Sequence, residues 1–386
     1  MPIMFFPEVQ RWIYTRVLKP IFFCLDPEKI HETMGEVGER LGSCRLGRAA
    51  TKRLFAYKHP ALEQTIAGIR FSNPVGLAAG WDYEGNLPSL LGSIGFGFGT
   101  VGTVTNGAYE GNPLPRLGRL PKSRSLLVNK GFKNRGIHFI LQKVETRNPF
   151  DVPIGLSIGK TNGPHSPMTQ EEAIKDVVEA FQTAEKSRAP FTHYELNISC
   201  PNLFGCVEFY SQPHLSSLLQ AVTGLRLSKP LFLKMPINES DVDTEKMLDI
   251  IVSFPVQGVI FGNLQKNRQD PSFNPEEMTH AGKGNFSGKP TKKRSNELLR
   301  LTYKKYGKRL ILIGCGGIFC AEDAYAKIRA GASLVQLITG MIFEGPEIIG
   351  LLNRDLVRLL KRDGFRSISD AIGTENLPSY VSDFSV

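Results

Sequence analysis

Residues 310–317, LILIGCGG, and residues 334–340, LVQLITG, decide the fold of this chain. Each is a short and nearly continuous apolar run, which is typical of a parallel strand buried on both faces. Each run also ends in glycine, which lets the backbone approach a bound phosphate closely, and helix-forming sequence follows. In a (β/α)8 barrel, the loops after the seventh and eighth strands form a phosphate site of this kind. The two runs therefore predict the last two strands of such a barrel, although glycines that merely turn the chain are the alternative.

Six earlier runs share the same apolar character and alternate with helical segments. Eight such units over roughly 270 residues match the size of one barrel. We therefore predict an α/β fold: a (β/α)8 TIM barrel over residues 46–364, with a small N-terminal helical extension at 1–45 and a C-terminal tail at 365–386. An open, doubly wound sheet is disfavoured because no GxGxxG motif opens a helix after a first strand. The six runs are 74–80, 97–104, 153–159, 193–199, 230–236 and 258–263.

The extension is predicted to hold two short helices. In the first, Val9, Trp12, Ile13 and Val17 form an apolar stripe at helical spacing, and Pro20 should end it. The second should begin at Asp26 as N-cap. Such stripes either lie on a membrane surface or pack on the protein's own core, and periodicity alone leaves both open. No stretch approaches the roughly 20 apolar residues of a membrane span.

Composition sets the broad class. Hydrophobic residues make up 41% and charged residues 22%, as in ordinary soluble globular proteins. A net charge of +10 suits anions such as phosphates, acidic substrates, nucleic acid or an anionic membrane, unless it is simply a solvated basic surface. The 6 cysteines have no paired spacing, so we expect neither a disulfide scaffold nor a metal site, and a reducing cytoplasmic compartment. The polar segment 264–295 is long enough for a lid or binding loop.

Polar residues that close two of the runs carry the candidate chemistry. Lys234 ends an apolar run, so its amino group points into the site or is paired. Beside the N1–C2 edge of a flavin it would stabilise the charge of the reduced ring. In ELNISCPN (195–202), Asn197 and Asn202 could bind the amide edges of a pyrimidine. Cys200 between them could abstract a proton if its pKa is lowered towards neutrality, or it could be a small core residue.

Six motifs in this order resemble the dihydroorotate dehydrogenases of pyrimidine biosynthesis, from about residue 5 to about residue 355. They are NPVGLAAG, GFGFGTVGTVT, EGNPLPRLGRL, ELNISCPN, IGCGGI and GASLVQLITG. The segment FCLDPEKIHE is similar to the extension of the membrane-associated, quinone-reducing class. The resemblance implies oxidation of dihydroorotate to orotate, FMN as cofactor and quinone as final acceptor. It further implies a quinone tunnel formed by the first helices and a peripheral position on the cytoplasmic face of the cell membrane.

The resemblance also assigns roles to individual residues. Cys200 matches the base that takes the C5 proton while C6 gives a hydride to flavin N5, and Arg119 matches an arginine near the quinone. The flavin-contacting positions are Ala79, Gly80, Thr103, Ser157, Asn197, Lys234, Gly288, Gly317, Ile338 and Thr339. The substrate-contacting positions are Asn129, Lys130, Gly131, Phe132, Asn197, Asn202 and Asn263.

Several positions depart from the family pattern. The quinone class normally carries serine where this chain has Cys200, and a lysine expected after AAG-x-D is Tyr83. The substrate loop, usually Asn-x-Met/Tyr-Gly, reads VNKGF, so that either Val128 or Asn129 stands at the asparagine position and Lys130 is introduced. We hypothesise that Lys130 replaces the missing cation for the substrate carboxylate. Further departures are Ser157 for asparagine, Leu264 in a Thr-Asn-Thr run and Ile338 for tyrosine.

Three other functions compete with this hypothesis. One is the soluble class of the same family, which carries cysteine and reduces fumarate or NAD. Another is a flavin reductase of uridine in RNA, which would need a C-terminal RNA-binding domain where this chain has a short tail; we therefore expect no nucleic-acid partner. The last is a membrane-binding barrel that has lost its substrate.

Overall fold

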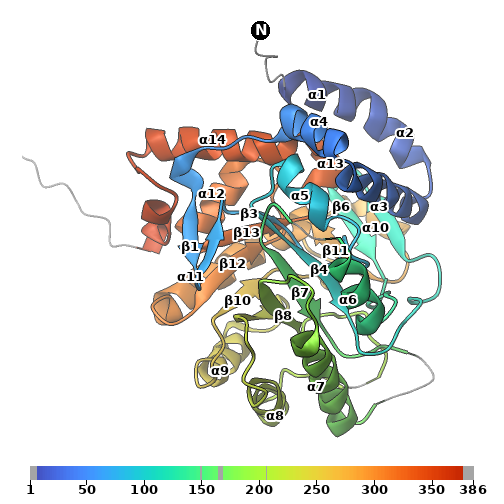
Figure 1. Cartoon of the computed structure of the whole chain (residues 1–386), viewed down its shortest axis with the longest axis vertical. Helices are drawn as coiled ribbons and strands as arrows, with labels where there is room; N and C mark the ends of the chain where they lie inside the picture. Colours follow the sequence, from blue (N-terminus) through green and yellow to red (C-terminus); the bar gives the residue numbers. More distant parts are fainter. Residues whose placement is uncertain (1–6, 148–149, 164–167, 206, 377–386) are drawn as a thin grey trace, which may run out of the picture.

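The computed structural model describes residues 7–147, 150–163, 168–205 and 207–376. Within them, eight parallel strands close into a barrel in chain order, with β13 paired to β3 (Figure 1). All eight predicted runs form these strands, so the predicted barrel is confirmed. The strands are β3 (Val75–Leu77), β4 (Phe98–Val104), β7 (Ile154–Ile158), β8 (His193–Asn197), β9 (Leu231–Met235), β10 (Gly258–Phe261), β12 (Ile311–Cys315) and β13 (Leu334–Leu337).

Helices between the strands cover the outside of the barrel (Figure 1). Their start signals are local, as α7 shows: Thr169 accepts from the backbone N–H of Glu172, whose side chain accepts from the N–H of Thr169. The covering helices are α5 (Pro88–Ile94), α6 (Ile137–Glu145), α7 (Gln170–Lys186), α8 (Gln212–Thr223), α9 (Asp241–Ile251), α11 (Lys292–Tyr306), α12 (Ala321–Arg329), α13 (Thr339–Glu344) and α14 (Ile348–Arg362).

The barrel interior is filled by side chains at the N-terminal ends of the strands. Phe98, Phe232 and Ile260 form a buried cluster there. Phe71 joins it from the hairpin of β1 (Gln64–Ile66) and β2 (Ile69–Phe71), with its ring 5.4 Å from that of Phe98. Because this end is packed shut, a ligand can reach the barrel only from the opposite, C-terminal end of the strands.

The first helices differ from the prediction at Pro20. Helix α1 (Pro7–Ile13) runs through a π-helical turn (Tyr14–Leu18) into α2 (Lys19–Cys24), which contains Pro20 at its start. The expectation that Pro20 ends the helix is wrong, because the π-helical turn before it absorbs the irregularity that a proline imposes. The expected N-cap is confirmed: Asp26 accepts from the N–H groups of Glu28 and Lys29 at the start of α3 (Pro27–Ser43).

The apolar stripe of the first helices faces outward. Val9, Trp12, Ile13 and Val17 are 53%, 61%, 42% and 44% exposed, so the alternative that this stripe packs on the protein's own core is wrong. Helix α4 (Arg45–Phe55), which was not predicted, follows α3 and packs against α3 and α5. In the described part of the chain, no helix combines the length and apolar character that crossing a membrane requires.

The segment 264–295 is not the open loop that its composition suggested. It contains α10 (Pro275–Thr279) and β11 (Asn285–Gly288), which pairs with β6 (Ser125–Val128), and β6 pairs in turn with β5 (Leu117–Leu120). This small antiparallel sheet is anchored by Phe273 and Phe286, which pack on Leu120. Since β6 precedes β11 by more than a hundred residues, no local pattern could reveal the pairing. The predicted tail contains two short 3-10 turns, Ser369–Ala371 and Thr374–Asn376, and its residues 377–386 lie outside the described chain.

Candidate active site

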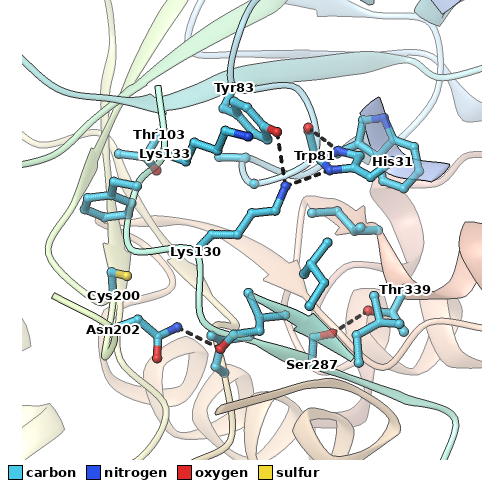
Figure 2. A pocket seen from close by; sticks show the side chains of 18 of the residues that line it. His31, Trp81, Tyr83, Thr103, Lys130, Lys133, Cys200, Asn202, Ser287 and Thr339 are labelled. Atoms are coloured by element: carbon cyan, nitrogen blue, oxygen red, sulfur yellow. Dashed lines mark hydrogen bonds between the residues drawn. The ribbon is translucent and has the colours of Figure 1, made fainter. Parts of the chain in front are cut away.

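A pocket of about 1180 Å³, including its open mouth, lies at the C-terminal ends of the strands. The strand ends form its floor, and α3 with the sheet of β5, β6 and β11 forms its roof (Figure 2). A smaller pocket of about 480 Å³ lies beside it, at the ends of β12 and β13. Lys234, Asn263, Ile338 and Thr339 line both pockets, so the two adjoin.

The structure brings most of the predicted site residues together. In the main pocket lie Ala79, Gly80, Thr103, Arg119, Lys130, Gly131, Phe132, Asn197, Cys200, Asn202, Lys234, Asn263, Ile338 and Thr339. Gly288 and Gly317 lie in the smaller one.

Ser157 and Asn129 line neither pocket. Ser157 is buried behind Thr103, with the two hydroxyl oxygens 2.9 Å apart. Asn129 turns its side chain away from both pockets, and the side-chain amide oxygen Oδ1 accepts from Asn112 at 3.0 Å. Val128 lines the pocket in its place.

Hydrogen bonds with Thr103 and Ser199 fix the two amide groups of Asn197 and Asn263 on the pocket floor. Asn197 at the end of β8 donates to the Thr103 hydroxyl at 2.7 Å and accepts from the Ser199 hydroxyl at 2.9 Å. Asn263, after β10, donates to the Ser199 hydroxyl and carbonyl oxygens at 2.6 and 2.7 Å. Each amide therefore has a defined orientation before any ligand binds. Sequence reasoning missed Ser199, although it lies inside the ELNISCPN motif.

Asn202 has a different environment from the one predicted. Its amide donates to the carbonyl oxygen of Val128 at 3.0 Å and its oxygen accepts from Asn285 at 2.7 Å. Asn112 donates to the backbone oxygen of Asn202 at 2.9 Å. The Asn202 side chain thus ties the loop after β8 to the roof. Asn112 and Asn285 were not predicted, and the only signal for Asn112 was its place in EGNPLPRLGRL.

Lys234 is buried at the end of β9 and exposes its amino group to both pockets. Within the described residues this amino group has no hydrogen-bond or ion-pair partner, so the alternative of a salt-bridged lysine does not hold there. The carboxylate of Glu195, buried below, accepts from Thr100 at 2.7 Å and Gln336 at 2.8 Å. Burial raises the pKa of Glu195 while the charge of Lys234 lowers it. A buried amino group without a partner is costly, so the pocket favours an acceptor beside Lys234.

Backbone N–H groups face the smaller pocket at the ends of β12 and β13. Gly317, Thr339 and Gly340 line it, and in the described chain no acceptor is recorded for their N–H groups. A side chain at Gly340 would come far inside van der Waals contact with the carbonyl oxygen of Ile318, so glycine is required here. Unpaired donors at a helix start suit a phosphate.

Cys200 lies three residues after β8, partly exposed on the pocket wall. Burial raises the pKa of its thiol to about 11, against the smaller lowering effects of the Asn202 N–H and the amino groups of Lys234 and Lys160. The lowered pKa that a base was expected to need is therefore not found. In this protein the thiolate is scarce at neutral pH and strongly basic when formed.

Lys130 crosses the pocket towards α3 and away from Cys200 (Figure 2). Its amino group lies 2.8 Å from His31 Nδ1 and 3.1 Å from the Tyr83 hydroxyl, and 4.5 Å above the Tyr83 ring. Burial lowers the pKa of Lys130 to about 7. The residue that replaces an expected lysine, Tyr83, thus contacts the newly introduced Lys130. Sequence reasoning did not single out His31, although FCLDPEKIHE contains it.

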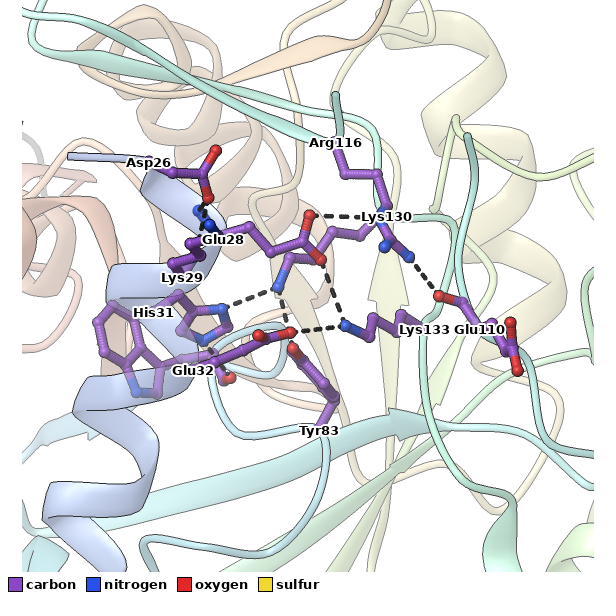
Figure 3. A network of polar contacts seen from close by, with 11 residues as sticks. Asp26, Glu28, Lys29, His31, Glu32, Tyr83, Glu110, Arg116, Lys130 and Lys133 are labelled. Carbon is purple, nitrogen blue, oxygen red and sulfur yellow. Dashed lines mark hydrogen bonds and ion pairs between the residues drawn. The ribbon is translucent and has the colours of Figure 1, made fainter. Parts of the chain in front are cut away.

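An ion-pair network surrounds this contact and connects α3 to the segments that flank β5 and β6 (Figure 3). Glu28 pairs with Arg116 at 3.2 Å and with Lys133 at 3.3 Å, and Lys133 also pairs with Glu32 at 2.7 Å. Glu28 and Glu32 are thus engaged by cations other than Lys130.

Comparison with known proteins agrees with this geometry. The family model "Dihydroorotate dehydrogenase" matches residues 61–360. The chain is 35% identical to the dihydroorotate dehydrogenase (quinone) of Mycolicibacterium smegmatis, over 93% of this chain and 98% of that protein. It is 33% identical to the protein of the same name from Trichodesmium erythraeum, over 94% and 99%. The chain belongs to the dihydroorotate dehydrogenase family. Among solved structures, the enzyme of Eimeria tenella in complex with ferulenol superimposes with a TM-score of 0.80 at 26% identity, covering 92% of this chain and 96% of that one.

Dihydroorotate dehydrogenases depend on a flavin, and the residues present here fit one. The unpaired amino group of Lys234 can donate to the N1–C2 carbonyl edge of the ring, where negative charge develops on reduction. The free N–H groups of Gly317, Thr339 and Gly340 can bind a phosphate. Lys234 and Thr339 line both of the adjoining pockets, as a single cofactor that spans them requires.

Proposed function

We propose that this protein oxidises dihydroorotate to orotate with FMN as cofactor, Cys200 as base and a quinone as final electron acceptor. The carrying observation is the pair of adjoining pockets: the thiol of Cys200 lines one, the free N–H groups after β12 and β13 line the other, and the unpaired amino group of Lys234 lies between them. The phosphate of a mononucleotide can be held in the smaller pocket, which the free N–H groups of Gly317, Thr339 and Gly340 line. The curated relatives, at up to 35% identity over nearly their whole length, support the quinone as acceptor.

The residues of the chain divide the reaction between them. Sγ of Cys200, as thiolate, takes the proton from C5 of the substrate and becomes a thiol. Asn197 and Asn263, held by Ser199, orient the ring so that the C5 proton faces the sulfur. Bound FMN supplies hydride acceptance from C6 and electron transfer to the quinone, which leaves as the quinol with two protons. Lys234 and Lys160 favour the thiolate electrostatically.

An anaerobic titration tests this proposal. The purified protein should carry bound flavin whose absorbance bleaches when dihydroorotate is added and returns with a quinone. A colourless protein that stays so after incubation with FMN, or a pigment that never bleaches, would refute it. Replacing quinone by fumarate or NAD distinguishes the soluble class, which should reoxidise the flavin with one of those acceptors instead.

The base assignment has its own test. Cys200→Ala should bind flavin and orotate as the native protein does but turn over at least ~100-fold more slowly, because a base acts in the transition state. Cys200→Ser is the matched control: it keeps a proton acceptor of similar size at the same place and should retain more activity than the alanine variant. Turnover of Cys200→Ala near the native rate excludes Cys200 as base.

For Lys130 we propose binding of the substrate carboxylate, together with the Tyr83 hydroxyl beside it. The support is charge: Lys130 is buried on the pocket wall, and its protonated amino group has no carboxylate partner in the described residues. Lys130→Ala should weaken orotate binding, and an unchanged orotate affinity would rule the role out. Tyr83→Phe isolates the hydroxyl contribution in the same titration.

We also propose a peripheral position on the cytoplasmic face of the cell membrane, with the quinone entering between the first helices. Supporting it is a row of exposed apolar side chains on α1 and α2, while the basic helix α4 suits anionic lipid head groups. The row consists of Val9, Trp12, Ile13, Val17, Leu18, Ile21 and Leu25. Arg119 lies behind it and donates to the carbonyl oxygen of Leu25 at 2.6 Å, next to the pocket.

Vesicle binding tests this position. Of the 2 tryptophans, Trp81 lines the pocket, so in a Trp81→Phe variant the emission reports Trp12 alone. Emission should shift to the blue when vesicles containing anionic lipid are added. Trp12→Ser should weaken co-flotation with those vesicles, whereas the control Val242→Ser, at an equally exposed apolar residue on α9, should not. Equal flotation of both variants would contradict the proposal.

A further inference from the structure

His31 on α3 has an assignable protonation state. Its Nε2 lies 2.8 Å from the carbonyl oxygen of Trp81, which can only accept, so Nε2 carries the hydrogen. Burial and the nearby charge of Lys130 lower the pKa of His31 to about 3, so the ring is neutral. Nδ1 is then an acceptor, and Lys130 donates to it at 2.8 Å. Edge-to-face contacts with Trp81 and Tyr83, with ring centroids 4.7 and 5.5 Å away, hold the ring in this orientation.

The hydrogen bonds of Lys130 leave its charge available. A protonated amino group has three donors, and two of them are directed at neutral acceptors, His31 Nδ1 and the Tyr83 hydroxyl. The carboxylates nearby, Glu28 and Glu32, pair with Arg116 and Lys133 instead. When Lys130 is protonated, one N–H and the positive charge therefore remain for an anion in the pocket. His31 and Tyr83 position the cation without neutralising it (Figure 3).

A lysine at this place needs such support. Its four-carbon side chain is flexible and would otherwise lose its position among many rotamers. Tyr83 comes from the barrel and His31 from the N-terminal helix, so the amino group is located only where both elements meet. The ion pairs of Glu28 with Arg116 and of Glu32 with Lys133 hold α3 in place, so that His31 stays within hydrogen-bond distance of Lys130.

We propose that His31 is a positioning residue for substrate binding, which holds the amino group of Lys130 in place for the carboxylate of dihydroorotate. The N-terminal helix α3 then contributes to the substrate site as well as covering it. This inference rests on the proposed role of Lys130 and assigns His31 to the substrate side of the reaction, not to the electron acceptor.

Two substitutions separate the two hydrogen bonds of the ring. His31→Asn places an oxygen near the position of Nδ1 and can still accept from Lys130. His31→Gln places an amide near Nε2, so that the bond to the Trp81 carbonyl is kept and the acceptor for Lys130 is lost. His31→Leu removes both bonds. His138→Leu, at an exposed histidine on α6, is the matched control.

The dissociation constant of orotate and the KM for dihydroorotate should rise at least about tenfold in His31→Leu and His31→Gln, because a hydrogen bond to a charged group is lost. The Asn variant should bind nearly as the native protein, as should His138→Leu. The kcat and the KM for quinone should change little. A reversed order of Asn and Gln, or an effect on quinone KM alone, would overturn the proposal.

Proton uptake gives a readout that does not depend on turnover. An anion beside Lys130 favours its charged form, so binding of orotate at pH 8 should take up close to one proton per site, measured by calorimetry in buffers of different ionisation enthalpy. The groups facing Lys130 from neighbouring elements are Tyr83, Glu28, Glu32, Arg116 and Lys133, and they are unchanged in the His31 variants.

The uptake should vanish in Lys130→Met and persist in His31→Asn. If Lys130→Met binds orotate like the native protein, the proposed role of Lys130 fails. If Lys130→Met loses affinity while every His31 variant binds normally, the positioning role alone fails.

Discussion

The thiol of Cys200 allows a direct test of how burial governs the base. Its pKa of about 11 lies two units above the ordinary value of 9.0. Because each unit changes the ionised fraction about tenfold, the thiolate of Cys200 should be about 100-fold scarcer below pH 9 than that of an ordinary cysteine. The perturbation is therefore pH itself, varied between 6.5 and 10 in about half-unit steps while the protein is exposed to iodoacetamide. Mass spectrometry of the peptides reports the alkylation rate of each cysteine separately.

Cys44 is the internal control in the same samples. It is exposed before α4, and the backbone N–H groups of Gly47 and Leu46 lower its pKa. Its alkylation rate should level off first, whereas the rate at Cys200 should still increase about tenfold per pH unit at the upper limit. Restricted access slows Cys200 equally at every pH, so the position of the plateau is the decisive quantity. A plateau for Cys200 below pH 9 would refute the argument that burial outweighs the nearby cations.

Three further predictions concern stability, the phosphate end and the quinone side. Burial lowers the pKa of Lys327 from 10.5 to about 7. Between pH 7 and pH 10.5 the unfolded chain therefore binds a proton at this residue that the folded chain lacks. The free energy of unfolding should rise with pH over this range, by up to about 1.4 kcal/mol per pH unit. Lys327→Met should flatten that rise in denaturant titrations, and an unchanged slope would contradict the assignment. Gly340→Ala should lose flavin and lower the melting temperature, because its methyl group collides with a backbone oxygen. Gly163→Ala, whose methyl group meets no atom of the described residues within 4 Å, should do neither. Arg119→Met should raise the KM for quinone several-fold and leave that for dihydroorotate unchanged; the opposite pattern would exclude its quinone role.

The barrel could be predicted because its strands are buried on both faces. Runs such as LILIGCGG carry a complete local signal, since every residue of β12 after Ile311 is buried. The roof could not be predicted, because β6 and β11 depend on a pairing between distant segments, and β11 carries a single large apolar side chain, Phe286. Pro20 failed as a helix end because its consequences depend on the π-helical turn before it.

The site shows the same division. Lys234 stands out in sequence because it interrupts an apolar strand end, and Cys200 because it lies between two asparagines just after another strand. Ser199 and Asn112 act only through hydrogen bonds to partners elsewhere in the chain, so sequence alone gives them no special character. The pKa of Cys200 was also beyond sequence, because it depends on how completely the folded protein surrounds the sulfur.

The position of the Lys130 amino group also depends on distant segments of the chain. The family resemblance leads one to expect a lysine on the barrel where this chain has Tyr83. The amino group of Lys130, from the segment after β6, lies 3.1 Å from the Tyr83 hydroxyl. A positive group is kept at that place although a different element carries it. The residues proposed to contact the flavin lie at the strand ends and not on α3, whereas Lys130 is held by His31, which lies 99 residues earlier on that helix. It follows that displacing α3 should weaken substrate binding before it weakens flavin binding. In this chain, the extension and the substrate site should therefore respond together to any surface that moves the first helices.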